Sequence, residues 1–134
     1  MKIVIIEDEI ELGQLMEKFL LKRIKSNTPN QIKVATNLKE GLQYIQDIHP
    51  DWVFLDNNLP DGKGINHIAT IKQGSTGIIM MSAMSNLKEK ALELGVNYFM
   101  DKPISFVEIQ RIISEASFTQ NTAQPTKEQP RVNP

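Results

Sequence analysis

The chain alternates five times between a short apolar run and a segment whose apolar residues recur at helical spacing. Repeated strand–helix alternation implies right-handed crossovers and a parallel sheet with helices on both faces. We therefore expect an α/β fold, doubly wound, with five strands and five helices. The expected strands are Lys2–Ile6, Gln31–Ala35, Trp52–Leu55, Ile78–Met81 and Val96–Met100.

Two of these runs indicate their place in the sheet. Residues 52–55 are apolar throughout, as in a central strand that is covered on both faces. Residues 31–35 alternate polar and apolar side chains, which is typical of an edge strand with one exposed face.

Four helix starts carry a polar residue followed three positions later by Glu, the pattern of a capping box. Asp8 with Glu11 is one such pair, and Asp8 could cap the first helix with one carboxylate oxygen while the other oxygen stays free for a second role. The other pairs are Asn37 with Glu40, Asn86 with Glu89, and Ser105 with Glu108.

The composition is that of one ordinary globular domain. The chain has 134 residues, 40% of them hydrophobic, and 15 basic side chains nearly balance 16 acidic ones. This balance gives no sign of direct nucleic-acid or membrane binding. No apolar stretch approaches the length of a membrane span, and we expect no signal peptide at the start. Without cysteines there are no disulfides or thiolate sites, and we expect a cytoplasmic protein.

The composition changes near residue 117. The last 18 residues hold three of the seven prolines and little that is apolar. Such a segment cannot bury enough surface to offset its ordering entropy. We therefore expect a domain over residues 1–116 and a disordered tail or linker over residues 117–134.

Charged side chains follow three of the apolar runs. Glu7 and Asp8 follow the first, Asp56 follows the third, and Lys102 follows the fifth. The carboxyl ends of parallel strands meet at one edge, where open α/β sheets bind their ligands. Clustered carboxylates repel one another unless a cation joins them, and Mg²⁺ prefers such oxygen ligands. The pattern predicts a Mg²⁺-assisted phosphoryl site.

Each residue of the predicted site has a specific role and an ordinary alternative. Asp56 is the candidate nucleophile, which would form an acyl phosphate, although an aspartate before a turn-rich loop is common. Lys102 would bind a phosphoryl oxygen, or be a surface lysine. Ser82 follows the fourth strand and would donate its hydroxyl to the phosphoryl group, or serve as a turn residue.

These residues resemble the receiver domains of two-component response regulators over about residues 1–116. Five elements occur in the order typical of that family: Glu7-Asp8, Asp56, the Leu59-Pro60-Asp61-Gly62 loop, Ser82-Ala83 and Lys102-Pro103. The resemblance implies a flavodoxin-like sheet with strand order 2-1-3-4-5.

The resemblance also implies roles for individual residues. Asp56 would be the phosphoacceptor, and Mg²⁺ would be held by Asp8, Asp56 and the main-chain carbonyl of Asn58, with Glu7 acting directly or through water. Lys102 would be the phosphoryl partner and Ser82 the switch hydroxyl. Phe99 occupies the aromatic switch position without the common tyrosine hydroxyl, so it could instead be a static core residue.

The function expected is therefore that of a phosphorylation switch. A sensor histidine kinase or phosphotransfer protein would donate to Asp56, and the signal would pass to a downstream protein through a face formed by the fourth helix, fifth strand and fifth helix. That face could also form a homodimer. The protein would not be an enzyme beyond catalysing its own phosphorylation and dephosphorylation.

Two alternatives belong to other classes. A pseudo-receiver would bind partners without phosphorylation, but the complete set of acids and lysine argues against it. An aspartyl-phosphate phosphohydrolase usually has a second Asp two positions after its nucleophile, where this chain has Asn58.

Overall fold

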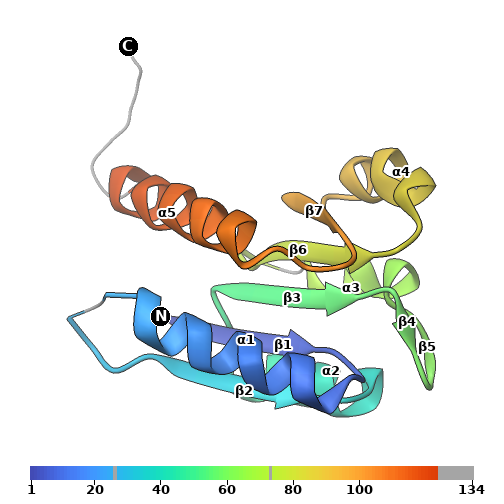
Figure 1. Cartoon of the computed structure of the whole chain (residues 1–134), viewed down its shortest axis with the longest axis horizontal. Coiled ribbons are helices and arrows are strands. Elements are labelled where there is room, and N and C mark those ends of the chain that lie inside the picture. Colours follow the sequence, from blue (N-terminus) through green and yellow to red (C-terminus); the bar gives the residue numbers. More distant parts are fainter. Residues whose placement is uncertain (26, 73, 124–134) are drawn as a thin grey trace. The chain divides into compact units, whose positions relative to one another are not determined.

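A five-stranded parallel sheet forms the centre of the fold (Figure 1). The computed structural model describes residues 1–25, 27–72 and 74–123, with residues 116–123 described by their main chain only. The strand order β2-β1-β3-β6-β7 is the predicted order 2-1-3-4-5, because the short strands β4 and β5 form a separate hairpin. The sheet strands are β1 (Lys2–Ile6), β2 (Gln31–Ala35), β3 (Trp52–Asp56), β6 (Gly77–Ser82) and β7 (Tyr98–Asp101).

Helices connect successive strands, as the alternating pattern predicts. Residues 1–104 form one compact unit, and the last helix, α5 (Phe106–Ala123), belongs to a second unit that starts at Ser105. The helices of the first unit are α1 (Ile10–Arg23), α2 (Leu38–Ile48), α3 (Ile68–Ile71) and α4 (Lys88–Glu93), and the 3-10 turns η1 (Gly64–His67) and η2 (Ser85–Leu87) precede α3 and α4.

Helices α1 and α2 cover opposite faces of the sheet. Val34 pairs with Ile5 in the strand register, and Gly13 of α1 packs so closely on Val34 that an added Cβ would lie 3.0 Å from its Cγ1. Ile6 points to the other face, because side chains alternate along a strand. There it contacts Gly41 of α2, at a distance that leaves no room for a Cβ. The sheet is therefore doubly wound.

The sequence predicted the buried and exposed strands correctly. Residues 53–56 of the central strand β3 are all buried, whereas the edge strand β2 is exposed at Gln31 and Lys33. Buried apolar residues of β1, β3, β6 and β7 form a continuous core with those of α2, α3 and α4. This core fixes the carboxyl edge of the sheet, where the charged residues lie.

Two of the four predicted helix caps are confirmed. Asn37 Oδ1 accepts a hydrogen bond from Glu40 N (2.8 Å), and Ser105 Oγ accepts one from Glu108 N (3.2 Å). Helix α1 instead begins at Ile10 with Glu9 at the N-cap position, so the prediction for Asp8 is wrong by one residue. The prediction for Asn86 is also wrong, because this residue lies within the 3-10 turn η2 that precedes α4.

Helix α5 continues to Ala123, past residue 116. The domain boundary expected at residue 116 stays a prediction. Residues 124–134, the rest of the predicted tail, lie outside the described residues. Among the described helices there is none with the length and apolar character needed to span a membrane.

The single tryptophan lies at the amino edge of the sheet, opposite the charged edge. Trp52 begins β3, and its ring centroid is 6.0 Å from that of Tyr98. On the neighbouring strand, Gly77 leaves space for the indole, which any Cβ at that position would overlap.

Candidate functional site

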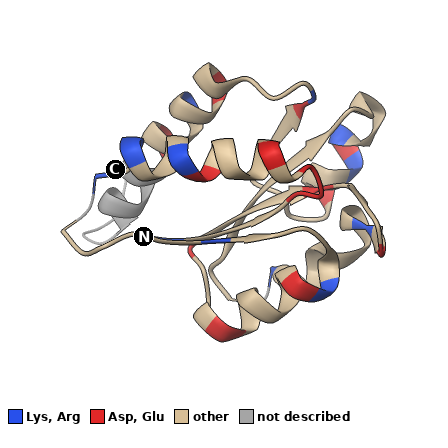
Figure 2. Cartoon of the chain, turned by 60° about the horizontal axis from the view of Figure 1, so that its bottom comes forward, with Lys and Arg blue, Asp and Glu red and all other residues tan. Residues whose placement is uncertain are grey.

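Three carboxylates meet where β1 and β3 end. Glu7 and Asp8 directly follow β1, and Asp56 is the last residue of β3. One carboxylate oxygen from each residue lies within 4.8 Å of the others. Glu7 and Asp56 are buried, whereas Asp8 is exposed and opens the cluster to solvent. In Figure 2 the loop before α1 is a continuous run of acidic residues.

Lys102 brings the opposite charge to this cluster from the end of β7. Its Nζ lies 2.9 Å from Glu7 Oε1 and 3.3 Å from Asp56 Oδ2. The main chain is held as well, because Lys102 N donates to the carbonyl oxygen of Ser82 (3.0 Å). The structure thus gathers Glu7, Asp8, Asp56 and Lys102 from three strands of the sheet.

Burial controls the protonation of this cluster. Burial raises the pKa of Glu7 to about 7, against the lowering effects of its hydrogen bonds with Glu9 N and Lys102. Burial likewise raises the pKa of Asp56. Burial alone would lower the pKa of Lys102, but the adjacent carboxylates of Glu7 and Asp56 outweigh it and raise that pKa. Near neutral pH the cluster therefore holds an ammonium and a readily released carboxyl proton.

The donor set suits a hard divalent cation. Three carboxylate oxygens of different residues converge, and carboxylates are the ligands that Mg²⁺ prefers in proteins. Burial of two of these carboxylates disfavours their charged forms, and a cation would remove that penalty. The residues present therefore fit Mg²⁺.

The loop after Asp56 is fixed by its own hydrogen bonds. Asn58 N donates to Asp56 Oδ1 (3.3 Å), and the buried side chain of Asn57 accepts a hydrogen bond from Ile65 N (3.0 Å). Gly64 N donates to Asn57 O (2.9 Å). Gly64 lies so close that a Cβ there would overlap the carbonyl oxygen of Asp56.

A short hairpin projects from this loop. Strands β4 (Asn58–Leu59) and β5 (Gly62–Lys63) pair antiparallel, with Asn58 opposite Lys63. The positive φ of 151° at Gly62 suits glycine. At the tip, the Asp61 carboxylate accepts hydrogen bonds from Leu38 N (2.8 Å) and Lys39 N (2.9 Å). These bonds lower the pKa of Asp61 and join the hairpin to the first turn of α2.

The two predicted switch residues lie on neighbouring strands. Ser82 ends β6, one residue beyond the partner of Asp56 in the strand register, and its buried Oγ accepts a hydrogen bond from Met84 N (3.0 Å). Phe99 is 9% exposed and belongs to the apolar core. No observation assigns a movement to either residue, so their switch roles stay predictions.

Two contacts at the site were not anticipated from the sequence. Glu9 Oε1 lies 3.8 Å from Lys102 Nζ, although the acidic run Glu7-Asp8-Glu9 was a visible signal. Lys63 Nζ donates to Asn58 Oδ1 at 2.7 Å. Proline and aspartate in the turn Leu59–Gly62 favour a tight turn that would pair these two residues.

Comparisons with known proteins agree on one family. Residues 3–114 match the response regulator receiver domain. The chain is 32% identical over 111 residues to the KDP operon transcriptional regulatory protein KdpE of Escherichia coli (strain K12), a match that covers 81% of this chain and 47% of KdpE. It is 30% identical over 108 residues to the transcriptional regulatory protein DpiA of the same organism, covering 78% of this chain and 46% of DpiA. The chain thus spans about half the length of these relatives.

Solved structures show the same fold. A two-component response regulator from Clostridium difficile superposes with a TM-score of 0.81 at 22% identity, covering 90% of this chain and 98% of the other. The receiver domain of NtrX from Brucella abortus gives a TM-score of 0.74 at 23% identity, with coverages of 87% and 98%. From the family match, together with the sheet order and the acidic edge, we conclude that the chain belongs to the response regulator receiver domain family of two-component systems.

Proposed function

We propose that the chain is a phosphorylation switch that accepts a phosphoryl group on Asp56 from the phosphohistidine of a sensor histidine kinase or a phosphotransfer protein. The observation that carries this proposal is the buried Asp56 carboxylate, with an ammonium 3.3 Å from its Oδ2 and two further carboxylates beside it. A carboxylate oxygen of Asp56 attacks phosphorus, the P–N bond breaks, and the imidazole nitrogen keeps the electron pair. The product is an aspartyl acyl phosphate.

Glu7, Asp8 and Asp56 would hold Mg²⁺, together with the main-chain carbonyl of Asn58. When bound, the metal ion neutralises negative charge on the phosphoryl oxygens. Lys102 would bind a phosphoryl oxygen, and its main chain is held by the hydrogen bond from its N to Ser82 O. The protein catalyses only its own phosphorylation and dephosphorylation in this scheme.

The signal would leave the site through Ser82. Its hydroxyl accepts a hydrogen bond from Met84 N in the structure, and a phosphoryl group on Asp56 offers it a charged acceptor instead. Turning toward that acceptor breaks the bond to Met84, which precedes η2 and α4. Phe99 packs in the core with Ala91 of α4 and can respond to the same shift.

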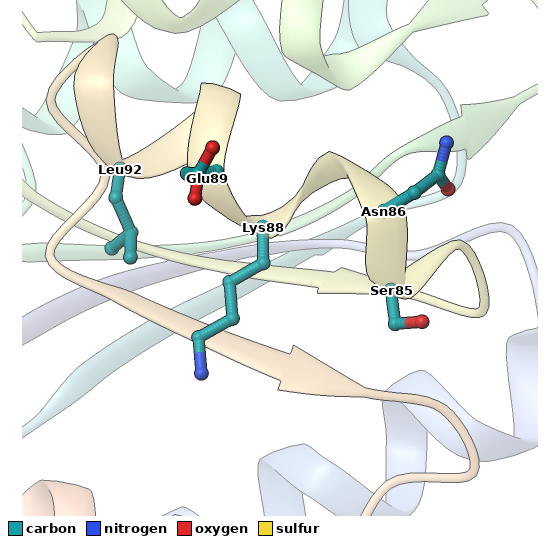
Figure 3. Close-up of a pocket in the computed structure, with 5 residues that line it drawn as sticks. All are labelled: Ser85, Asn86, Lys88, Glu89 and Leu92. Carbon is teal, nitrogen blue, oxygen red and sulfur yellow. The ribbon is translucent and has the colours of Figure 1, made fainter.

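The segment that would move has a recognisable surface. An open pocket of about 450 Å³ lies beside η2 and α4, lined by Ser85, Asn86, Lys88, Glu89 and Leu92 (Figure 3). Leu92 offers exposed apolar surface there beside polar side chains, and apolar contact with a polar rim is the usual make-up of a protein interface. We propose that a downstream protein docks at this surface. The interaction would take place in the cytoplasm.

The test is phosphorylation with a small acyl phosphate donor in the presence of Mg²⁺, followed by intact-protein mass spectrometry. We expect one added phosphoryl group, its loss in Asp56→Asn, and its retention in the matched control Asp47→Asn on the exposed face of α2. A folded wild-type protein that incorporates no phosphoryl group would contradict the proposal and favour a pseudo-receiver. Full labelling of Asp56→Asn would contradict the site.

Metal binding has its own measurement. Calorimetric titration with Mg²⁺ should show one binding event that is weakened by Asp8→Asn and tighter at higher pH, because binding displaces the Glu7 proton. Glu7→Gln should remove most of this pH dependence. Equal affinity in the wild type and Asp8→Asn would exclude Asp8 as a ligand.

A further inference from the structure

The hydrogen bond between Lys63 and Asn58 lies immediately beside the proposed phosphorylation site. Lys63 Nζ donates to Asn58 Oδ1 at 2.7 Å, across the hairpin in which the two residues are direct partners. Asn58 N in turn donates to Asp56 Oδ1 at 3.3 Å. One residue, Asn58, therefore contacts the phosphoacceptor through its main chain and a lysine through its side chain.

The hairpin that carries Lys63 is held at both ends. At its tip, Asp61 accepts two hydrogen bonds from the first turn of α2. At its base, Gly64 N and Ile65 N both donate to Asn57. Lys63 lies between these anchors, so its main chain is held opposite that of Asn58.

Asn58 is an exposed polar residue of the loop that contacts Asp56 through its main chain, so its amide is the candidate group to assist hydrolysis of an acyl phosphate on Asp56. In that reaction a water oxygen attacks phosphorus, the bond from phosphorus to the Asp56 oxygen breaks, and the electron pair returns to the carboxylate. Both water protons leave with the phosphate as H₂PO₄⁻. A free amide oxygen next to the site can accept a hydrogen bond from the attacking water and orient it.

We propose that Lys63 is a positioning residue that holds the Asn58 amide oxygen and thereby lengthens the lifetime of phosphorylated Asp56. An amide oxygen that already accepts a bond from an ammonium is a poorer acceptor for water and is fixed in direction. This inference rests on the proposed function, because it concerns the lifetime of the same acyl phosphate.

The experiment follows the decay of the phosphorylated protein after removal of the donor, with Mg²⁺ present. Lys63→Met keeps the length of the side chain but donates no hydrogen bond. We expect it to speed decay by about fivefold, the rate equivalent of one ordinary hydrogen bond. Lys63→Arg, which keeps the charge and the donors, should retain the slow decay. Lys18→Met, at an exposed position on α1, is the matched control and should leave decay unchanged.

A double-variant comparison separates positioning from charge. If Lys63 acts through Asn58, then Lys63→Met should not change the decay rate of a protein that already carries Asn58→Ala. An equal acceleration in both backgrounds would overturn the inference, because Lys63 would then act by its charge alone. An unchanged rate in the single variant would overturn it as well.

Failure of the proposed function looks different from failure of this inference. In the first case neither the wild type nor any variant takes up a phosphoryl group. In the second case every protein is labelled, and Lys63→Met either decays like the wild type or speeds decay equally with and without Asn58→Ala. Thermal unfolding of each variant, which we expect to match the wild type because Lys63 and Asn58 are exposed, confirms that the comparison is made on folded protein.

Discussion

The Lys102 ammonium lies closer to Glu7, at 2.9 Å, than to the proposed phosphoacceptor Asp56, at 3.3 Å. Glu7 is completely buried, whereas Lys102 retains 19% of its side-chain exposure. The buried acid thus holds the ammonium at the mouth of the site before any phosphoryl group arrives. A phosphoryl group on Asp56 would compete with Glu7 for the same ammonium, and this competition makes Glu7 and Lys102 a coupled pair.

The free energy of unfolding of the metal-free protein should fall as pH rises through about 7. Glu7 binds its proton more tightly in the folded state, with a pKa of about 7, than at the ordinary value of 4.5 expected after unfolding. Its contribution is therefore complete below pH 4.5 and is lost as pH rises through the folded pKa. The raised pKa of Asp56 acts in the same direction.

Urea unfolding at several pH values between about 5 and 8 measures this contribution, which we expect to be on the order of 2 kcal/mol. Glu7→Gln cannot titrate and is the control, so its stability should change less over the same range. A wild-type stability that increases steadily with pH would contradict the raised pKa.

Replacing Lys102 by Met should destabilise the protein, and more at about pH 8 than at about pH 6. Without the ammonium, Glu7 is a buried charge with no opposite charge beside it, which costs on the order of 3 kcal/mol. At the lower pH Glu7 is protonated and the cost shrinks. Adding Glu7→Gln should restore part of the lost stability at the higher pH, and chemical unfolding of the four proteins measures the coupling. Strictly additive effects would show that the pair is not coupled.

Gly64→Ala should disturb the loop that follows Asp56. A Cβ at this position would overlap the carbonyl oxygen of Asp56 and lie 3.0 Å from Leu55 Cγ, so the main chain must move. We expect a loss of about 1–3 kcal/mol in the free energy of unfolding and slower phosphorylation of Asp56. Gly74→Ala tests the same chemical change where no atom lies within 4 Å of the added Cβ, although its positive φ of 88° adds some strain. It should unfold more easily but be phosphorylated normally.

Asp61→Ala should lower the melting temperature by removing two hydrogen bonds at the start of α2. The Asp61 carboxylate accepts from Leu38 N and Lys39 N, which otherwise have no partner within the first turn of the helix. Because these bonds lower the pKa of Asp61, the stabilisation is lost as pH falls through the folded pKa. Asp61→Asn keeps one acceptor oxygen and should have an intermediate melting temperature. Equal melting temperatures of Asp61→Ala and the wild type would show that these two hydrogen bonds do not stabilise the protein.

Much of the fold could be predicted because its signals are local. The apolar run at residues 52–55 predicted a central strand, and the alternation at residues 31–35 predicted an edge strand, since burial follows directly from side-chain pattern. The gathering of acids and a lysine followed from topology, because parallel strands bring their carboxyl ends to one edge. The helix caps were less predictable. The pattern of Asn86 followed by Glu89 fits a helix cap, but in the structure Asn86 lies within a 3-10 turn.

The remaining features depend on contacts between distant segments. The bond from Asp61 to the start of α2 joins residues more than twenty positions apart, and nothing in the local sequence indicates it. The pairing of Lys63 with Asn58 requires knowledge of the turn that lies between them. The raised pKa of Glu7 depends on burial by the assembled sheet and cannot be deduced from the acidic run itself.

The position of Trp52 determines what its fluorescence can report. The indole of Trp52 and the proposed phosphoacceptor Asp56 occupy opposite ends of β3, four residues apart, which corresponds to about 13 Å along the strand. Surrounded by Tyr98 and Gly77, the indole senses whether β3, β6 and β7 remain assembled. We therefore expect its emission to report unfolding of the sheet and to change little when Asp56 is modified.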